Sequence, residues 1–337
     1  MNSKILAFET SCDDTCVAVV DTSYKVHSSI VSSQIEHSEY GGVVPEIASR
    51  VHLKNILPLT KLSLKKANTK LSEIDAFAVT TNPGLIGSLI VGLSFAKTLA
   101  YTCNKPFICV NHILAHVCSI YLENPNLLPP FLALIVSGGH THLVYFETME
   151  KFVTVGRTVD DAAGEAFDKS AKMIGLGFPG GIQIDRLAKE GNKNFHRFPR
   201  AKIGSGEYDF SYSGLKSSIY RYIQKNGNSF VQKNIKDISA SIQSAIVEPL
   251  VNKTIKYAKN HSVDKIVVCG GVAANSYLRS QFFKKAKREK IDILLPKIKY
   301  CMDNAAMVGA RASQKFKQKL FSPFDVNANS KKGITVI

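Results

Sequence analysis

Short apolar runs separated by turn-forming residues dominate the start of the chain. Ile5–Phe8, Thr15–Val20 and residues 25–33 are rich in β-branched and other apolar side chains, a pattern typical of three consecutive strands. Residues 44–68 then carry apolar side chains at helical spacing, and we expect Pro58 to break or kink that helix. The pattern next predicts a strand, a helix, a strand and a second helix at residues 74–81, 82–103, 107–110 and 112–122.

The same order of patterns returns after the proline-rich segment 125–130, which we interpret as a linker. Two apolar runs flank a Gly-Gly turn within residues 131–147, a third run follows, and then come helices and two further strands. Residues 191–234 show no clear periodicity and are expected to form a loop-rich insertion. Few residues are identical between the halves, so only the pattern repeats. It predicts a duplicated α/β protein with a ligand-binding cleft between its halves.

Two histidines stand four positions apart in the segment "VNHILAHVCSIYL". Asn111 is expected to cap a helix that starts at His112, and His116 would then lie on the same helix face. Both imidazoles can therefore point toward one metal ion, with packed or solvent-facing histidines as an equal alternative. The glutamate of the H-E-x-x-H motif is missing between them, which disfavours a metalloprotease.

A third metal ligand would have to come from a distant part of the chain. Asp303 follows a strand pattern and precedes a helix, a place where capping is the ordinary role of an aspartate. Two imidazoles and one carboxylate would suit Fe(II) or Zn(II). Spacing alone does not bring Asp303 to the histidines.

Three Gly-Gly turns lie beside predicted strands or helices, at residues 138–139, 180–181 and 270–271. Backbone N–H groups at such turns can hold an anion, so together they favour a nucleotide-phosphate site. Neither a P-loop nor a dinucleotide-binding glycine motif occurs.

Several carboxylates follow predicted strands or begin predicted helices. We interpret Asp160 and Asp161 as partners of a helix dipole. Asp168 lies further into its helix and could bond a ribose or another hydroxyl. The acidic turn after the first strand, which holds Glu9, Asp13 and Asp14, is a suitable place for a base or for a metal-bound water.

Charge and cysteine content bear on the expected partner and on the cellular location. The formal charge of +16 favours a polyanionic partner, nucleic acid before an acidic membrane, although a Lys-rich proteome would produce the same surplus. Seven cysteines without a C-x-x-C pair argue against a disulfide framework. No signal-peptide pattern is present, and Leu85–Tyr101 is too short for a membrane span, so we expect a buried helix there and a cytoplasmic location.

A series of motifs extends over almost the whole chain: "ETSCDDT", "YGGVVPEIASRVH", "NPGLIGSLIVG", "NHILAH", "VSGGHT", "DDAAGEAFDK", "FPGGIQIDRLA", "DFSYSGLKS", "CGGVAAN" and "CMDNAAM". Together, and in this order, they resemble the tRNA N6-adenosine threonylcarbamoyltransferase family of the TsaD type. Asn82, Asp14 and Ile182 depart from residues common in the family, but none of them is an expected ligand.

The resemblance implies the actin, sugar-kinase and Hsp70 (ASKHA) superfold, an α/β fold with duplicated ribonuclease-H-like halves and an interdomain cleft. The halves would be residues 1–128 and 129–302, with a C-terminal helix at about 303–337 packing back on the first. The implied reaction moves a threonylcarbamoyl group from threonylcarbamoyl-AMP to N6 of adenosine 37 in tRNAs that read ANN codons, which forms t6A. One divalent metal, Fe(II) before Zn(II), would orient the donor on His112, His116 and Asp303.

Carried over residue by residue, the resemblance also implies a set that lines the adenylate: Ile135, Val136, Ser137, Gly138, Gly139, Asp168, Gly181, Asp185 and Asn275. Our candidate for removing the proton from N6 is Asp13, at the end of the first strand, with an orienting or structural role as the alternative. Expected partners are tRNA, threonylcarbamoyl-AMP, a non-catalytic TsaB-type paralogue and a small P-loop ATPase of the TsaE type, with no membrane. A separate enzyme would make the adenylate.

Two other functions stay open at this point. An ASKHA-type ATPase or kinase would use the glycine turns in the same way, but it would hold Mg²⁺ on carboxylates and phosphates without a histidine pair. A non-catalytic tRNA-binding scaffold would explain the positive charge and would have no use for a bound metal.

Overall fold

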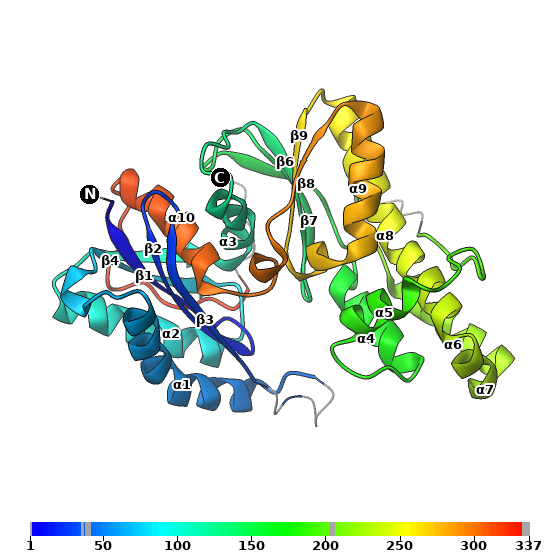
Figure 1. Ribbon diagram of the computed structural model, residues 1–337, viewed down its shortest axis with the longest axis horizontal. Coiled ribbons are helices and arrows are strands. Elements are labelled where there is room, and N and C mark those ends of the chain that lie inside the picture. The colour runs from blue at the N-terminus through cyan, green and yellow to red at the C-terminus, as the bar shows by residue number, and fades with distance from the viewer. Residues whose placement is uncertain (1, 35–36, 38–41, 202–205, 332–337) are drawn as a thin grey trace. The chain divides into compact units, whose positions relative to one another are not determined.

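The computed structural model describes residues 2–34, 37, 42–201 and 206–331, which form two compact units (Figure 1). The first unit contains the described residues up to Leu127 together with those from Met302 to Lys331. The second unit is Leu128–Cys301. The chain therefore leaves the first unit, forms the second and returns.

A five-stranded mixed sheet forms the centre of the first unit, in the order β3-β2-β1-β4-β5. Its strands are β1 (Lys4–Glu9), β2 (Asp14–Asp21), β3 (Val26–Ser33), β4 (Ala76–Asn82) and β5 (Phe107–Asn111). The first three strands pair antiparallel, whereas β4 and β5 are added in parallel. Strand β1 is central and buried on both faces, which is why its sequence is continuously apolar until Glu9.

Helices cover both faces of this first sheet (Figure 1). One layer contains α1 (Pro45–Lys66) and α2 (Ile86–Thr102), and the other contains α3 (His112–Cys118) and the returning helix α10 (Ala305–Lys317). Short 3-10 turns, Leu71–Glu73 and Ser119–Leu122, complete the unit. Helix α1 runs through Pro58 without interruption, so the expected break is wrong. Its buried side chains include Ala48, Ile56 and Thr60 at helical spacing, and this packing holds the helix together.

The second unit repeats the sheet of the first, in the order β10-β9-β6-β7-β8. Its strands are β6 (Phe131–Val136), β7 (Thr141–Phe146), β8 (Phe152–Arg157), β9 (Lys265–Cys269) and β10 (Asp292–Leu294). Again three antiparallel strands are extended by two parallel ones. The equal strand order in both sheets confirms the predicted duplicated α/β architecture.

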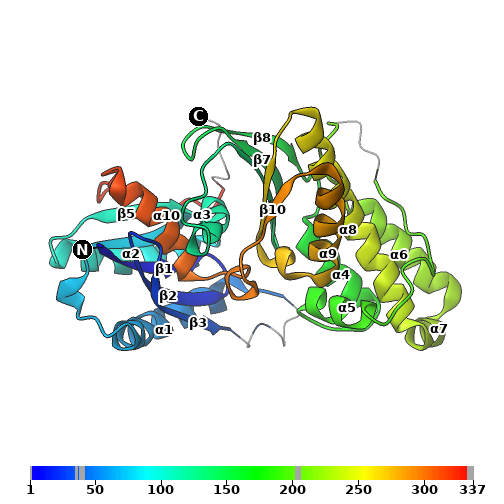
Figure 2. The ribbon, with the colours of Figure 1, turned by 45° about the horizontal axis from the view of Figure 1, so that its top comes forward.

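The helices of the second unit gather on one side of its sheet (Figure 2). They are α4 (Ala163–Met173), α5 (Gly180–Ala188), α6 (Ser213–Asn226), α7 (Asn228–Lys233), α8 (Ile235–Asn260) and α9 (Ser276–Glu289), with short 3-10 turns at Gly271–Ala274 and Ile298–Tyr300. The expectation of a loop-rich segment at 191–234 is partly wrong, because α6 and α7 lie within it. Residues 202–205 of that segment lie outside the described residues.

Helix α2 is only half-buried, contrary to the expectation of a buried helix. Ile86, Ile90 and Tyr101 are 49%, 50% and 75% exposed, whereas Leu89 and Leu93 face the core. Over the part of the chain that is described, no helix combines the length and apolar character needed to cross a membrane. All seven cysteines are free thiols, in agreement with the predicted absence of a disulfide framework.

Candidate metal centre and substrate-binding residues

The end of β5 and the start of α3 place both histidines. Asn111 caps α3 as predicted: its Oδ1 accepts hydrogen bonds from the backbone N–H groups of Ile113, at 2.9 Å, and Leu114, at 3.1 Å. His112 is the first residue of the helix, and His116 lies one turn further along the same face. Both rings are buried, with 6% and 1% exposure.

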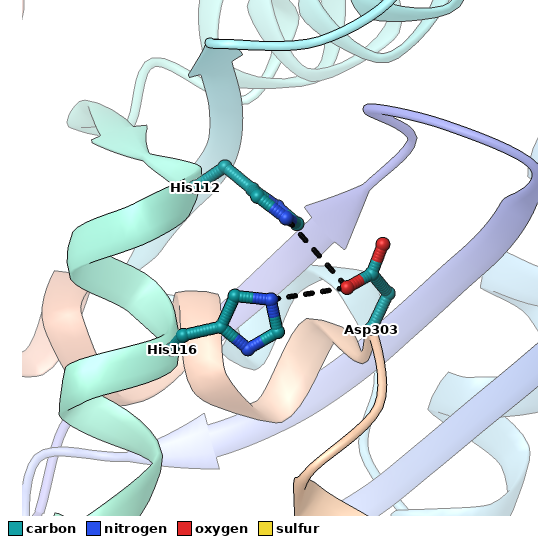
Figure 3. Close-up of side chains that lie close together, drawn as sticks. All are labelled: His112, His116 and Asp303. Carbon is teal, nitrogen blue, oxygen red and sulfur yellow. Dashed lines mark ion pairs between the residues drawn. The ribbon is translucent and has the colours of Figure 1, made fainter. Parts of the chain in front are cut away.

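Asp303 reaches the two imidazoles from the segment before α10 (Figure 3). Its Oδ1 lies 3.1 Å from His116 Nε2 and 3.6 Å from His112 Nε2. The expected capping role of Asp303 is wrong, because Asn304 caps α10 by accepting a hydrogen bond from Met307 N–H at 2.9 Å. A 3-10 turn, rather than a strand, precedes Asp303. The structure thus brings together three residues that are far apart in the sequence.

These three side chains fit one divalent cation. Ligand atoms that share a cation at bonds of about 2.1 Å lie roughly 3.0–3.5 Å apart, close to the spacing seen here. Both ring nitrogens of His116 are buried and have no hydrogen-bond partner among the described residues. A buried, unpaired polar group is costly, and coordination of a cation would remove that cost. His112, His116 and Asp303 therefore form a possible metal-binding triad.

A buried glutamate at the end of β1 contacts Nδ1 of His112, the ring nitrogen opposite the one that faces Asp303. Glu9 is 0% exposed, and its Oε2 lies 2.9 Å from His112 Nδ1 and accepts a hydrogen bond from Thr80 Oγ1 at 2.6 Å. Burial alone would raise the pKa of Glu9, but the adjacent His112 ring lowers it. Burial opposes protonation of His112, yet Asp303 and Glu9 raise its pKa to about 9. The sequence suggested only a general acidic role for Glu9.

Further carboxylates make the surroundings of the triad negative. Burial, followed by repulsion from Asp303, Asp13 and Glu9, raises the pKa of Asp14 to about 6 despite a hydrogen bond from Ser33. Burial, followed by Asp13, Asp303 and Asp14, raises the pKa of the Cys12 thiol far above its ordinary value, so this thiol is not a reactive thiolate. Several acids that disfavour each other's charge form an environment that favours a cation. Asp13 is partly exposed in the turn between β1 and β2.

In the second unit, the first Gly-Gly turn follows β6 and is bonded to the start of α4. The carbonyl of Ser137 accepts from Gly164 N–H at 3.2 Å, and the carbonyl of Gly138 accepts from Glu165 N–H at 3.1 Å. Gly138 and Gly139 are exposed, and a Cβ on either would meet no atom within 4 Å. The packing of the chain therefore does not explain the missing side chains. Close approach of a ligand to the turn would explain them. Ile135 and Val136 are buried strand residues that lead into it.

Asp185 and Asn275 meet at a second polar cluster of the same unit. Asp185 accepts hydrogen bonds from the backbone N–H and hydroxyl of Ser276, at 3.2 and 2.8 Å. Asn275 caps α9 through Leu278 N–H at 2.9 Å. Gln243, which sequence reasoning missed, is 3% exposed and donates from Nε2 to both Asp185 Oδ1, at 2.7 Å, and Asn275 Oδ1, at 3.2 Å.

Asp168 and Gly181 meet at the start of α5. Oδ1 of Asp168 accepts from the backbone N–H groups of Gly180, at 2.8 Å, and Gly181, at 3.3 Å. Burial raises the pKa of Asp168, although these two N–H groups act in the opposite direction. Asp168 thus has a structural role at a helix start, and at least one of its oxygens is engaged by the chain itself.

The sequence suggested that Asp160 and Asp161 serve the start of α4, but the first N–H groups of that helix donate instead to Thr141, Ser137 and Gly138. Asp160 Oδ1 accepts from Tyr212 N–H at 2.8 Å, and its Oδ2 accepts from the hydroxyls of Ser211 and Ser213, at the start of α6. Asp161 forms ion pairs with Lys169, at 3.1 Å, and with Lys216. These carboxylates therefore fasten α6 to the segment before α4.

The fold defines a class of protein. The structure is similar to HypF from T. kodakarensis, with a TM-score of 0.65 and 13% identity over 94% of this chain and 48% of that one. It is also similar to component A of the (R)-2-hydroxyglutaryl-CoA dehydratase of Acidaminococcus fermentans, with a TM-score of 0.55, 14% identity and 93% and 98% of the two chains covered. These likenesses concern the fold alone. Together with the duplicated sheets they confirm the ASKHA superfold.

Sequence comparison defines the family. A profile of the tRNA N6-adenosine threonylcarbamoyltransferase family (TsaD) matches residues 25–310. A relative of that name from Kosmotoga olearia is 48% identical over 326 residues, which are 96% of this chain and 97% of that protein. One from Clostridium botulinum is 47% identical, with 96% of each chain covered. The chain belongs to the tRNA N6-adenosine threonylcarbamoyltransferase family and is an acyltransferase that modifies tRNA.

Proposed function

We propose that the chain transfers the threonylcarbamoyl group of threonylcarbamoyl-AMP to N6 of adenosine 37 in tRNAs that read ANN codons, with one bound metal orienting the donor. The observation that supports the metal most directly is His116, whose buried ring nitrogens have no hydrogen-bond partner in the described structure and lie beside His112 and Asp303. Such a group is stabilised when a cation accepts its lone pair.

The donor set favours Fe(II) before Zn(II). Two imidazoles and one carboxylate on one side of a cation, with the other positions open, are typical of non-haem Fe(II) sites. Zn(II) also accepts these ligands. When bound, the cation supplies a Lewis acid that orients and polarises the oxygens of the donor. This chain's own contribution is to hold three ligands in place at a buried site before the cation arrives.

We infer that residues of the second unit hold the adenylate part of the donor. The open turn Ser137–Gly139 lets backbone N–H groups approach the phosphate. Asp185 and Asn275, which Gln243 holds, offer polar atoms for the ribose and the base. Asp168 would act with Gly181 at the start of α5, and Ile135 and Val136 would support the turn from below.

The transfer itself needs little covalent help from the protein. The N6 nitrogen of adenosine attacks the carbamoyl carbon of the mixed anhydride, a C–N bond forms, and the bond between that carbon and the phosphate oxygen breaks. AMP leaves with the electron pair, and the proton of N6 passes to a base. Asp13, a partly exposed carboxylate in an acidic turn, is our candidate for that base. Positioning of the two reactants supplies most of the acceleration in such a reaction.

The expected partners follow from this reaction. The formal charge of +16 suits the phosphates of tRNA, and adenosine 37 is accessible because it lies in a loop. A TsaB-type paralogue and a TsaE-type ATPase would assist, and a separate enzyme would supply threonylcarbamoyl-AMP. A cytoplasmic location is part of the same proposal, in keeping with seven free thiols.

The test is mass analysis of tRNA nucleosides after incubation of the purified protein with tRNA, threonylcarbamoyl-AMP and both partners. We expect t6A and about one equivalent of iron or zinc per chain. His116→Ala should lose both the metal and the product. His27→Asn should lose neither, because His27 lies on β3 and pairs with Asp21 at 2.9 Å. Formation of t6A at the full rate by metal-free protein would contradict the metal, and absence of t6A with every component present would contradict the transfer.

A further inference from the structure

We propose that Glu9 is a positioning residue for this reaction: it fixes the proton of His112 on Nδ1 and thereby aims the Nε2 lone pair at the cation. Glu9 itself touches neither donor nor tRNA in this proposal. The inference rests on the metal site of the proposed function. The sequence did not predict the contact between Glu9 and His112.

The contacts of Glu9 determine which ring nitrogen carries the proton. Its Oε2 lies 2.9 Å from His112 Nδ1, and an ionised carboxylate can only accept hydrogen bonds. Nδ1 must therefore be the donor in this contact. Nε2, the nitrogen that faces Asp303 at 3.6 Å, then offers its lone pair whenever the ring is neutral. That is the tautomer that a cation at the triad requires.

The second neighbour of Nδ1 cannot replace Glu9. The hydroxyl of Ser11 lies 3.1 Å from the same nitrogen, but a hydroxyl can donate as well as accept. Ser11 alone would leave both tautomers of His112 open. The carboxylate removes that freedom because it has no proton to donate.

The position of Glu9 is itself fixed by the fold. Its Oε1 accepts the backbone N–H of Ser11 at 2.6 Å, and its Oε2 accepts the hydroxyl of Thr80, on the neighbouring parallel strand β4, at 2.6 Å. With Nδ1–H of His112, three donors surround a carboxylate that has no exposed surface. They offset the cost of burying its charge and leave it one orientation toward the ring.

The two imidazoles of the triad differ in this respect. Among the described residues, His116 has no hydrogen-bond partner for either ring nitrogen. His112 is therefore held by a hydrogen bond at Nδ1, whereas the contact of His116 is with Asp303, another candidate ligand, whose Oδ1 lies 3.1 Å from Nε2. Loss of Glu9 should therefore disturb the orientation of His112 and leave that of His116 unchanged.

The variant Glu9→Gln tests this inference. Glutamine has the same shape, but its NH₂ group must face either Ser11 N–H, where two donors would meet, or the ring, where Nδ1 would have to accept in the other tautomer. We expect Zn²⁺ affinity, measured by competition with a chromophoric chelator, to fall 10- to 100-fold, the usual effect of losing such a partner. The matched control is Asp21→Asn, which makes the same change in another carboxylate–histidine pair, with His27 at 2.9 Å, at the opposite end of β2 from the triad, and which should change the affinity less than threefold.

A spectroscopic measurement on the metal-free protein separates this inference from the metal proposal. The ¹⁵N spectra of histidine-labelled protein are recorded at increasing pH until the His112 resonances no longer change, so that the ring is neutral, with His112→Asn for assignment. We expect the Nδ1–H tautomer of His112 in the natural protein and in Asp21→Asn, and a mixture in Glu9→Gln.

An unchanged tautomer together with unchanged Zn²⁺ affinity in Glu9→Gln would overturn the inference. If the variant does not fold, Glu9→Asp serves instead: it keeps the charge but withdraws the oxygen from the ring, and the same two changes are expected with smaller amplitude. Absence of metal binding by the natural protein would refute the metal proposal, while the tautomer measurement would still decide the role of Glu9 toward His112.

Discussion

Single residues decide where the candidate ligands point, and two asparagine caps are among them. Asn111 satisfies the first N–H groups of α3, and Asn304 does the same for α10. Because these caps are present, neither His112 nor Asp303 is needed at a helix end. Their side chains are left to face one another, together with His116. A shift of the second cap by one residue, onto Asp303, would remove the carboxylate from the triad.

Asp160 provides a pH-dependent test at this scale. Burial alone would raise its pKa, but hydrogen bonds from Ser211, Tyr212 and Ser213 lower it below the ordinary value of 3.8. A carboxyl with a depressed folded pKa stabilises the folded state above its unfolded pKa, and this contribution is lost as the pH falls through the folded pKa. Asp160→Asn should therefore lower the melting temperature at pH 7, and the difference from the natural protein should shrink below about pH 4.

Melting curves recorded by circular dichroism between pH 3 and pH 8 give this comparison. The control is Asp292→Asn, which changes an exposed carboxylate on β10 and should show no such convergence. A melting difference for Asp160→Asn that persists unchanged at acidic pH would contradict the assigned role of the carboxylate.

Sequence reasoning was strong for residues with a local signal. The histidine pair and the cap at Asn111 were readable from spacing, because a helix face and its first turn are local properties. Asp303 was a possible third ligand from its position before a helix, but only the family resemblance joined it to the histidines. The role of Glu9 could not be read at all, since its partners His112 and Thr80 are distant in sequence and meet it only when β1 and β4 pair.

At the scale of elements, the start of α4 supports the turn that follows β6. A Cβ on Gly164 would lie 2.5 Å from the carbonyl oxygen of Ser137 and 2.7 Å from the Cα of Gly138. The helix can approach the turn only without a side chain there. The packing of this helix against the turn therefore helps to set the position of the backbone that we propose for the phosphate.

Gly164→Ala should displace this turn. We expect a loss of stability of about 1–3 kcal/mol, the usual cost of overpacking, and a rise in KM for threonylcarbamoyl-AMP of at least tenfold. The matched control is Gly214→Ala in α6, where a Cβ meets nothing within 4 Å and a better helix former should be neutral or stabilising. Chemical denaturation and steady-state kinetics give both quantities. A control that lost donor affinity as strongly as Gly164→Ala would show that the turn is not the cause.

The predicted elements agree with the structure where the pattern was strong, and the misses have physical causes. The strands were recognisable because β-branched runs are bounded by turn residues. The break at Pro58 was wrong because tertiary packing of α1 outweighs the lost hydrogen bond. Helix α6 was missed although Leu215, Ile219 and Ile223 recur every four residues, since the polar residues around them hid the short apolar stripe.

At the scale of the whole molecule, the positive charge is unevenly distributed along the chain. In residues 128–301, Lys and Arg outnumber Asp and Glu by nearly two to one, whereas the rest of the chain is closer to balance. The second unit therefore carries most of the surplus. Exposed basic side chains are frequent on its helix α9.

The distribution predicts which unit contributes more to the salt dependence of tRNA binding. Lys284→Glu combined with Lys287→Glu on α9 should weaken tRNA binding about tenfold at low salt, and the slope of log affinity against log salt should fall by about one or two. Lys54→Glu with Lys61→Glu on α1 is the matched control, with two exposed lysines on a helix of the first unit. Filter-binding titrations at several salt concentrations measure both. A larger effect of the α1 pair would place the phosphate contacts on the first unit.

The return of the chain to the first unit has a consequence for biosynthesis. Helix α10 packs on β1 and β2, and Asp303 directly precedes it. On a ribosome, both strands emerge long before this helix does, so a nascent chain that ends near Cys301 has one sheet face covered only by α3 and lacks one of the three candidate ligands. Capture of iron or zinc would therefore be a late event, which follows synthesis of the second unit.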